Sequence, residues 1–372
     1  MEIEIGRGKK ARRAYGFDDI AIVPSRRTRD AEDVDIAGRL GQHLLELPLL
    51  ASAMDGVVSP ETAVILGKLG GLGVLNLEGI WTRYDDAEAE LERIAEYEKA
   101  EATREMQQIY AEPVKPELIA QRIAEIKAEG VLAAASLTPQ RVREYWQIAL
   151  EAGLDVLVIQ GTVVSAEHVS TVVEPLNLKQ FINELPVPVI VGGCASYQAA
   201  LHLMRTGAAG VLVGFGGGAA HTTRTALGIH APMASAVADV AAARRDYLDE
   251  SGGRYVHVIA DGGVGTSGDI VKAVACGADA VMLGAALARA ADAPGGGYHW
   301  GPEAHHPQLP RGERIALGAQ ASLEEILFGP GRQADGTTNV IGALKRAMAT
   351  TGYSDVKEFQ RVEVVVSPYL GN

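Results

Sequence analysis

A glycine-rich loop that ends in a histidine and two threonines is the segment best suited to chemistry. It reads Gly-Phe-Gly-Gly-Gly-Ala-Ala-His-Thr-Thr-Arg over residues 214–224 and follows an apolar run, 209–213, that predicts a buried strand. Four glycines in the first five positions suit a backbone that must approach a ligand or an ion closely. His221 can serve as a general base or a hydrogen-bond partner near neutral pH, and Thr223 adds a hydroxyl group.

Two further segments combine small residues with the end of an apolar run. Asp261 precedes two glycines, and Gly284 precedes two alanines. Small residues near the start of a helix let phosphate oxygens reach backbone N–H groups. A carboxylate such as that of Asp261 can accept two hydrogen bonds from a ribose diol. The pattern indicates a nucleotide monophosphate, although many phosphate-binding barrels share it.

The elements that must position these segments alternate between apolar runs and helical stretches. Eight runs predict strands, at residues 48–53, 71–77, 131–137, 155–160, 187–192, 210–215, 256–260 and 280–285. Ser59-Pro60-Glu61 and Ser196 predict helix starts between them. We therefore predict a TIM (β/α)8 barrel over residues 1–372, with a doubly wound sheet as the alternative. In a barrel, the loops that follow the strands would bring the candidate segments to one face.

Residues 78–130 interrupt this alternation between the second and third predicted strands. The charged stretch 85–110 predicts one long helix, Pro113 and Pro116 break the chain, and 117–128 predicts another helix. Either a solvated surface excursion or an oligomer contact would account for this helical insertion.

Composition narrows the class of protein. Hydrophobic residues make up 47% of the 372 residues, with 43 glycines, as expected for an α/β barrel. The net charge of −13 predicts no nucleic-acid partner. Cys194 and Cys276 provide neither a disulfide framework nor metal-ligand spacing. No apolar run reaches the ~18 residues that span a bilayer, so we expect a soluble, cytoplasmic protein without a membrane partner.

Several motifs together resemble those of one enzyme family. The loop 214–224 resembles the active-site loop of the IMP dehydrogenase/GMP reductase family, roughly G-x-G-P-G-S-x-C-T-T-R. Residues 16–24 resemble the family's F-D-D-V-x-x-x-P motif, and 49–55 resemble its S-x-M-D strand. Residues 258–263, 267–273 and 277–284 match the family signature almost residue for residue. Because residues 78–130 are too few for the family's regulatory CBS-domain pair, the chain resembles the short, CBS-less branch.

This resemblance implies a ligand, a cofactor and an assembly. It implies an oxidoreductase of purine nucleotide metabolism that interconverts IMP, XMP and GMP with NAD or NADP. It also implies a homotetramer, and a potassium ion held by backbone carbonyls of Gly216, Gly218 and His221. The residues implied for the purine nucleoside monophosphate are Ser52, Met54, Asp261, Gly263, Gly284 and Ala285.

The chain departs from the family at positions that do chemistry. His221 stands where the family has the cysteine that attacks C2 of the purine, while Thr223 keeps the place of a threonine near the leaving group. His221 could act as a nucleophile, contact the purine, act as a base or pack the loop. Gln160 replaces an aspartate that helps to hold the cofactor ribose. Cys194 replaces an asparagine, and is either a relocated nucleophile or a small hydrophobe.

Residues 291–340 predict a flap-like loop region without the Arg-Tyr pair that dehydrogenases use to activate water. Arg311 is its candidate for a nucleotide contact, and a surface arginine is the alternative. Metal binding is a further alternative for His299, His305 and His306. Two functions remain open: an oxidoreductase with an altered mechanism, and a pseudoenzyme that senses nucleotide or partners a catalytic homologue.

Overall fold

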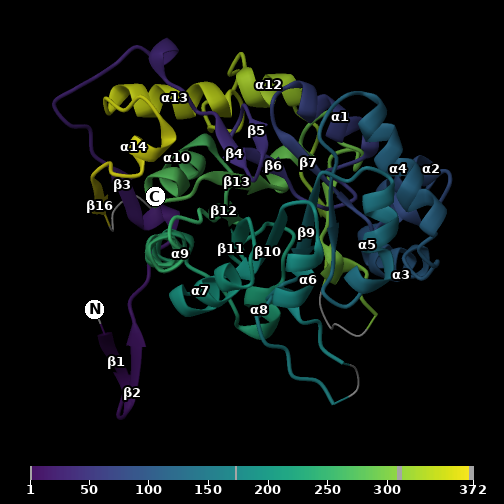
Figure 1. Cartoon of the computed structure of the whole chain (residues 1–372). Helices are drawn as coiled ribbons and strands as arrows, with labels where there is room; N and C mark the ends of the chain where they lie inside the picture. The colour runs from purple at the N-terminus through teal and green to yellow at the C-terminus, as the bar shows by residue number, and fades with distance from the viewer. Residues whose placement is uncertain (1, 172–173, 308–311, 368–372) are drawn as a thin grey trace.

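The computed structural model describes residues 2–171, 174–307 and 312–367. Its centre is a closed barrel of eight parallel strands in sequence order, with the last strand paired to the first (Figure 1). This confirms the predicted TIM barrel, because a doubly wound sheet would stay open. The barrel strands are β6 (Leu49–Ala51), β7 (Leu72–Asn76), β8 (Ala134–Leu137), β9 (Val156–Gln160), β10 (Val189–Cys194), β11 (Gly210–Val213), β12 (His257–Asp261) and β13 (Ala280–Leu283).

Side chains of the barrel strands alternate between the barrel interior and the surrounding helices. Leu50 and Val158 belong to the apolar cluster that fills the interior, whereas their neighbours Leu49 and Leu157 pack in the larger cluster beneath the helices. This is the two-residue period of a strand. Because the interior is filled by apolar side chains, polar groups for function must come from the loops at the strand ends.

Helices cover the outside of the barrel (Figure 1). Ser59 and Ser196 cap two of them as predicted, accepting hydrogen bonds from the N–H groups of Thr62 and Ala199. The outer helices are α1 (Pro60–Lys68), α4 (Pro116–Ala128), α5 (Val142–Glu151), α6 (Leu178–Glu184), α7 (Tyr197–Arg205), α9 (Met233–Glu250), α10 (Ser267–Ala275) and α13 (Val340–Thr350). Within the described ranges, no helix combines the length and the apolar character needed to cross a membrane.

The segment between β7 and β8 differs from its prediction in one respect. It contains η3 (Ile80–Thr82), α2 (Ala87–Glu96) and α3 (Lys99–Ile109) before α4. The single helix predicted over 85–110 is wrong, because Tyr97 and Glu98 have extended backbone and separate α2 from α3. At this break the guanidinium of Arg314 donates hydrogen bonds to backbone carbonyls at the end of α2. A partner distant in the sequence therefore stabilises the interruption.

The predicted flap-like region follows β13 and a short helix. β14 and β15 pair in an antiparallel ladder, and η4 lies between them in the sequence. The short helix is α11 (Ala285–Ala288). The elements of the flap-like region are β14 (Tyr298–His299), η4 (Pro302–Ala304), β15 (Ile315–Ala316) and α12 (Leu323–Phe328).

The first and last described strands lie outside the barrel. β1 (Glu2–Gly6) and β2 (Lys9–Arg12) form a hairpin that projects away from the other elements in Figure 1. Residues 7–13 hold five basic side chains, a local concentration that the net charge of the whole chain conceals. The absence of a nucleic-acid partner, inferred from net charge, therefore stays a prediction.

The remaining elements are η1 (Phe17–Asp19), β3 (Ile20–Ile22), η2 (Ala31–Asp33), β4 (Gly38–Leu40), β5 (His43–Leu45), α8 (Thr223–Leu227), α14 (Val356–Phe359) and β16 (Val364–Val366), which pairs with β3.

Candidate functional site

A cavity of about 240 Å³ lies at the carboxyl ends of the barrel strands. Loops after β6, β8, β9, β11 and β12 form its wall together with residues of the flap-like region. This is the face on which TIM-barrel enzymes carry their active sites. The predicted site residues that line the cavity are Met54, Gln160, Gly216, Gly218, His221 and Asp261. Thr138, Thr162, Glu303 and His306 also line it, although no sequence pattern predicts a role for them in a nucleotide site.

Asp261 is the acidic group at the end of β12. Burial raises the pKa of its carboxyl to about 6, against the opposing effects of nearby His221 and a hydrogen bond. That bond comes from Gln160 at the end of β9, whose Nε2 donates to Oδ2 of Asp261 at 3.0 Å. The Gln160 amide thus orients the Asp261 carboxyl within the cavity. Contact between Gln160 and a cofactor stays a prediction.

The glycine-rich loop after β11 brings His221 beside Asp261. A Cβ atom on Gly214 would lie 2.2 Å from the carbonyl oxygen of Asp261, so glycine is needed for the loop to approach β12 this closely. A Cβ on Gly218 would lie 2.7 Å from Nδ1 of His221, so glycine also leaves room for the ring. His221 Nδ1 is buried and has no hydrogen-bond partner among the described residues. A buried ring nitrogen without a partner is expected where a bound ligand supplies the missing hydrogen bond.

Thr223 and Glu303 form a buried pair beside His221. The Thr223 hydroxyl donates to Oε1 of Glu303 at 3.2 Å, and the two residues are 1% and 3% exposed. Oε2 of Glu303 is buried and has no partner within the described part of the chain. A Cβ on Gly301 would lie 2.9 Å from this oxygen and 3.8 Å from Cε1 of His221, so the carboxyl and the imidazole share one wall of the cavity. A buried carboxyl joined to a hydroxyl can move a proton to or from a ligand.

Two of the three residues predicted for phosphate, Gly284 and Ala285, follow β13, next to Ser52 at the end of β6, whereas the third, Gly263, follows β12. The backbone N–H of Ser52 donates to the carbonyl of Leu283 at 2.9 Å. A Cβ on Gly284 would lie 3.5 Å from Ser52 Oγ and 3.3 Å from His299 Nε2, so these groups meet. Gly284 precedes α11, which Ala285 begins. Burial lowers the pKa of His299 to about 4, with a further contribution from His221, so the ring is neutral at physiological pH.

Met54 lines the same cavity, and Gly263 directly follows Gly262, which also lines it. A Cβ on Gly217 would lie 3.3 Å from the backbone nitrogen of Gly263, which places the loop after β12 against the glycine-rich loop. Met54, after β6, reaches the position of a Gly301 Cβ with its terminal methyl at 3.8 Å. Its thioether thus provides an apolar surface on the cavity wall.

Cys194 has a different environment. Its side chain is 1% exposed and packs in the apolar cluster beneath the helices, and it does not line the cavity. Burial raises the pKa of the thiol to about 12, so the reactive thiolate is strongly disfavoured. These surroundings favour the reading of Cys194 as a small hydrophobe over that of a nucleophile.

Three further predictions concern Arg311, a metal at the histidines of the flap-like region, and potassium at the glycine-rich loop. Arg311 lies outside the described residues. The described residues include no group of three or more histidine, cysteine, aspartate or glutamate side chains that could hold a metal ion, which disfavours a metal at His299, His305 and His306. The carbonyl of Gly218, predicted to hold potassium, accepts a hydrogen bond from the His221 N–H at 3.0 Å. A second lone pair on that oxygen stays available for a cation.

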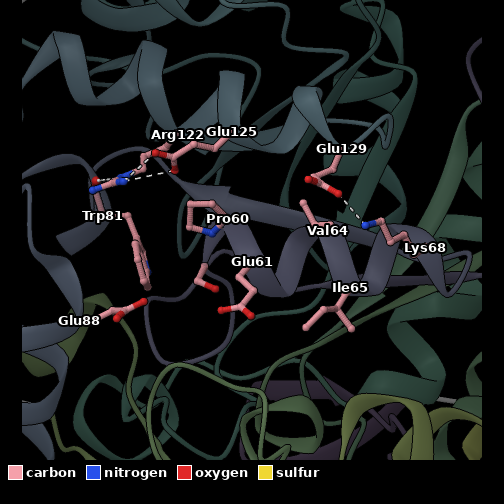
Figure 2. Close-up of a pocket in the computed structure, with 11 residues that line it drawn as sticks. Pro60, Glu61, Val64, Ile65, Lys68, Trp81, Glu88, Arg122, Glu125 and Glu129 are labelled. Carbon is pink, nitrogen blue, oxygen red and sulfur yellow. Dashed lines mark hydrogen bonds and ion pairs between the residues drawn. The ribbon is translucent and has the colours of Figure 1, made fainter.

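A larger cavity of about 500 Å³ lies on the outside of the barrel. Figure 2 shows it along α1, with Trp81 and Glu88 at one end and residues of α4 above. Here Lys68 forms an ion pair with Glu129 at 2.6 Å, and Arg122 forms one with Glu125 at 3.0 Å (Figure 2). We place the candidate site at the barrel mouth, because an imidazole, two carboxyl groups and an amide (His221, Asp261, Glu303 and Gln160) line that cavity, whereas the outer cavity holds two ion pairs.

Comparison with known proteins gives consistent matches. The sequence model of the IMP dehydrogenase / GMP reductase domain matches residues 14–303. An uncharacterized oxidoreductase of Mycolicibacterium smegmatis is 50% identical over 98% of this chain and 99% of its own length. Inosine-5'-monophosphate dehydrogenase of Methanocaldococcus jannaschii is 25% identical over 96% of this chain and 94% of its own. The crystal structure of an IMP dehydrogenase/GMP reductase-like protein from Corynebacterium glutamicum is 50% identical, covers 98% of both chains and superposes with a TM-score of 0.94.

Proposed function

Because the chain belongs to the IMP dehydrogenase/GMP reductase family, we propose that it is an oxidoreductase that acts on a purine nucleoside monophosphate with a nicotinamide cofactor. The observation that carries this proposal is the buried hydrogen bond from Thr223 to Glu303, because Glu303 lines the same cavity as Asp261. Asp261 would bind the ribose, and Glu303 with Thr223 would move a proton at the purine. A structural scaffold has no need of both at one cavity.

Nucleotide binding would use Asp261 and Met54, which line the cavity, and the residues predicted for phosphate, which lie outside its lining. The ionised carboxyl of Asp261, held by Gln160, would accept hydrogen bonds from the ribose hydroxyls. Backbone N–H groups at Gly263, Gly284 and Ala285 would hold the phosphate near Ser52, and Met54 would pack against the base. Ala285 contributes no side-chain hydroxyl, so backbone groups would carry more of the phosphate interaction. A contact from Arg311 stays a prediction.

A nicotinamide would lie in the part of the cavity next to Gln160. Thr138, Gly161 and Thr162 line it there, and their hydroxyl and backbone groups suit the carboxamide of a nicotinamide. When bound, the cofactor supplies hydride exchange with C2 of the purine. Glu303 would deliver or remove a proton, through Thr223, at the group that leaves or enters at C2. His221 would hydrogen-bond the purine with its free Nδ1 instead of forming a covalent adduct.

The alternative function is a nucleotide-binding pseudoenzyme. The specific observation in its favour is His221, because an imidazole replaces the cysteine on which the family's covalent chemistry depends. Such a protein would sense purine nucleotide or assemble with a catalytic homologue. In either case we expect a homotetramer, and a potassium ion at the carbonyls of Gly216, Gly218 and His221.

The test combines binding with turnover. Calorimetric titration of IMP, GMP and XMP with potassium present should show micromolar binding of one nucleotide, and nicotinamide absorbance should then report turnover with NAD or NADP. Glu303→Gln should lower kcat by about 100-fold or more, since general acid–base catalysis typically contributes that much, and should leave nucleotide affinity nearly unchanged. Binding without turnover in the parent protein would favour the pseudoenzyme. Failure to bind any of the three would overturn both functions.

A further inference from the structure

Tyr110, the residue that follows α3, joins three distant segments through its hydroxyl group. The indole Nε1 of Trp300 donates to Tyr110 Oη at 2.8 Å, and Tyr110 Oη donates to Oδ2 of Asp55 at 2.5 Å. Trp300 and Asp55 are each 2% exposed, and Tyr110 is 8% exposed. The hydrogen bonds therefore lie in the interior and connect the insertion to the flap-like region and to the loop after β6. Hydrogen bonds to a buried carboxylate are among the strong ones.

The aromatic ring of Tyr110 makes a second contact with the flap-like region. It stacks face to face on His305, with ring centroids 3.5 Å apart and planes 3° apart. His305 is adjacent in sequence to His306, and Asp55 is adjacent to Met54, both of which line the cavity. One side chain of the insertion thus contacts segments on two walls of the candidate site.

Asp55 approaches the backbone of the insertion as closely as glycine permits. A Cβ atom on Gly79 would lie 1.9 Å from Oδ1 of Asp55, so any side chain there would displace the carboxyl group. The carboxyl is consequently fixed between Gly79 on one side and the Tyr110 hydroxyl on the other. Tyr110 in turn has one defined acceptor.

Arg314 forms a separate connection between the insertion and the flap-like region. Its guanidinium donates to the carbonyls of Ile94 and Tyr97, the latter at 2.7 Å, where α2 ends. It also lies 4.0 Å from the ring centroid of Tyr298 in β14. Arg314 is 8% exposed, so this connection is also buried. The guanidinium replaces the helical hydrogen bonds that the break between α2 and α3 removes.

We propose that the helical insertion positions one wall of the cavity: Tyr110 and Arg314 hold the segment 298–306 in place, so that Glu303 stays at Thr223. This differs from a solvated surface excursion, because the face of α3 that carries Ala102, Met106 and Ile109 is buried. Only the catalytic consequence rests on the proposed function. The mechanical part can be measured without any nucleotide.

Hydrogen exchange tests the mechanical part. Tyr110→Phe removes both hydrogen bonds of the hydroxyl and keeps the stack on His305. We expect backbone amides of residues 298–306 to exchange about tenfold faster or more, as the loss of a buried, charge-assisted hydrogen bond predicts. Tyr145→Phe is the matched control, because Tyr145 is 3% exposed and its hydroxyl bonds Arg141 next to α5. Equal exchange in both variants and the parent would overturn the proposal.

A second variant covers the possibility that Tyr110→Phe fails to fold. Trp300→Phe removes the indole donor from the other end of the same chain of hydrogen bonds, and should increase exchange in 298–306 in the same direction. Thermal unfolding of each variant would show whether it is folded at the temperature of the exchange experiment. A folded Trp300→Phe protein with parental exchange would count against the positioning role.

The catalytic consequence is read from steady-state kinetics. Tyr110→Phe should lower kcat by about tenfold while the nucleotide affinity stays within about twofold of the parent, because Glu303 and not Asp261 is displaced. An equal loss of kcat in Tyr145→Phe would overturn the catalytic consequence. A parent protein without turnover would count against the proposed function, and the exchange measurement would still decide the positioning role.

Discussion

The cavity at the barrel mouth is smaller than the cavity outside α1, yet it holds a carboxyl group with a raised pKa. The outer cavity is about twice as large, at about 500 Å³ against about 240 Å³. There Glu125 and Glu129 form ion pairs with Arg122 and Lys68, and Lys68 lowers the pKa of Glu129. At the mouth, burial instead raises the pKa of Asp261 to about 6. Burying a carboxylate without enough hydrogen-bond or ionic partners costs free energy, and carboxyl groups with pKa values shifted in this way are concentrated at functional sites.

Buried polar atoms without partners sharpen the same contrast. At the mouth they include His221 Nδ1 and Glu303 Oε2, which lie on one wall of the cavity. Among the described residues that line the outer cavity, Trp81 Nε1 is the one such atom. Unmet hydrogen bonds that converge on one space indicate a ligand more strongly than the volume of that space.

Among the variants that test whether the mouth, and not the outer cavity, binds the ligand, Asp261→Ala is expected to have the largest effect. Asp261→Ala should weaken nucleotide binding by about 3 to 6 kcal/mol, or more than about 100-fold, because two hydrogen bonds to an ionised carboxylate are lost. Calorimetry with the nucleotide that the parent binds measures it directly. The control is Asp246→Ala on α9, where an exposed carboxylate is removed far from the mouth. Parental affinity in Asp261→Ala would mean that the mouth does not bind ribose.

A smaller effect is expected in the pH dependence of stability near the mouth. Burial raises the pKa of Asp55 to about 6 from its usual 3.8, so folding favours the protonated carboxyl. The stabilisation is complete below about pH 4 and is lost as the pH rises through about 6, a change of about 3 kcal/mol for this group. Asp55→Asn should therefore flatten the decline between pH 4 and 7 in denaturant titrations. Parallel curves for parent and variant would contradict the raised pKa.

The sequence was sufficient for the barrel but not for its insertion. Short apolar runs, and capping serines such as Ser59 and Ser196, are local signals that the packed barrel only reinforces. The break between α2 and α3 was not predictable in this way. Residues 85–110 have helical composition throughout, and the group that stabilises the break, Arg314, is 220 residues from Ile94. Tertiary hydrogen bonds here outweigh local helix propensity.

The same distinction applies to the candidate site. Glycines at strand ends are visible in the sequence because the backbone itself needs them there, and Asp261 is visible as a charged residue at the end of an apolar run. Glu303 was not identified, because its partner Thr223 lies 80 residues away and neither residue marks the other in the sequence. Gln160 was recognised as a departure, but its bond to Asp261, 101 residues away, appears only in the folded chain. Pairs formed by folding are what sequence spacing cannot show.

The smallest effect is expected in the outer cavity, and it tests the contrast from the other side. Lys68→Ala removes the exposed ion pair with Glu129, and such pairs contribute little because water and salt screen them. We expect no measurable change in thermal stability, in nucleotide affinity or in turnover. A change in nucleotide affinity would show that the outer cavity communicates with the mouth. The two cavities would then be parts of one functional system, and volume would have been the better guide to it than unmet hydrogen bonds.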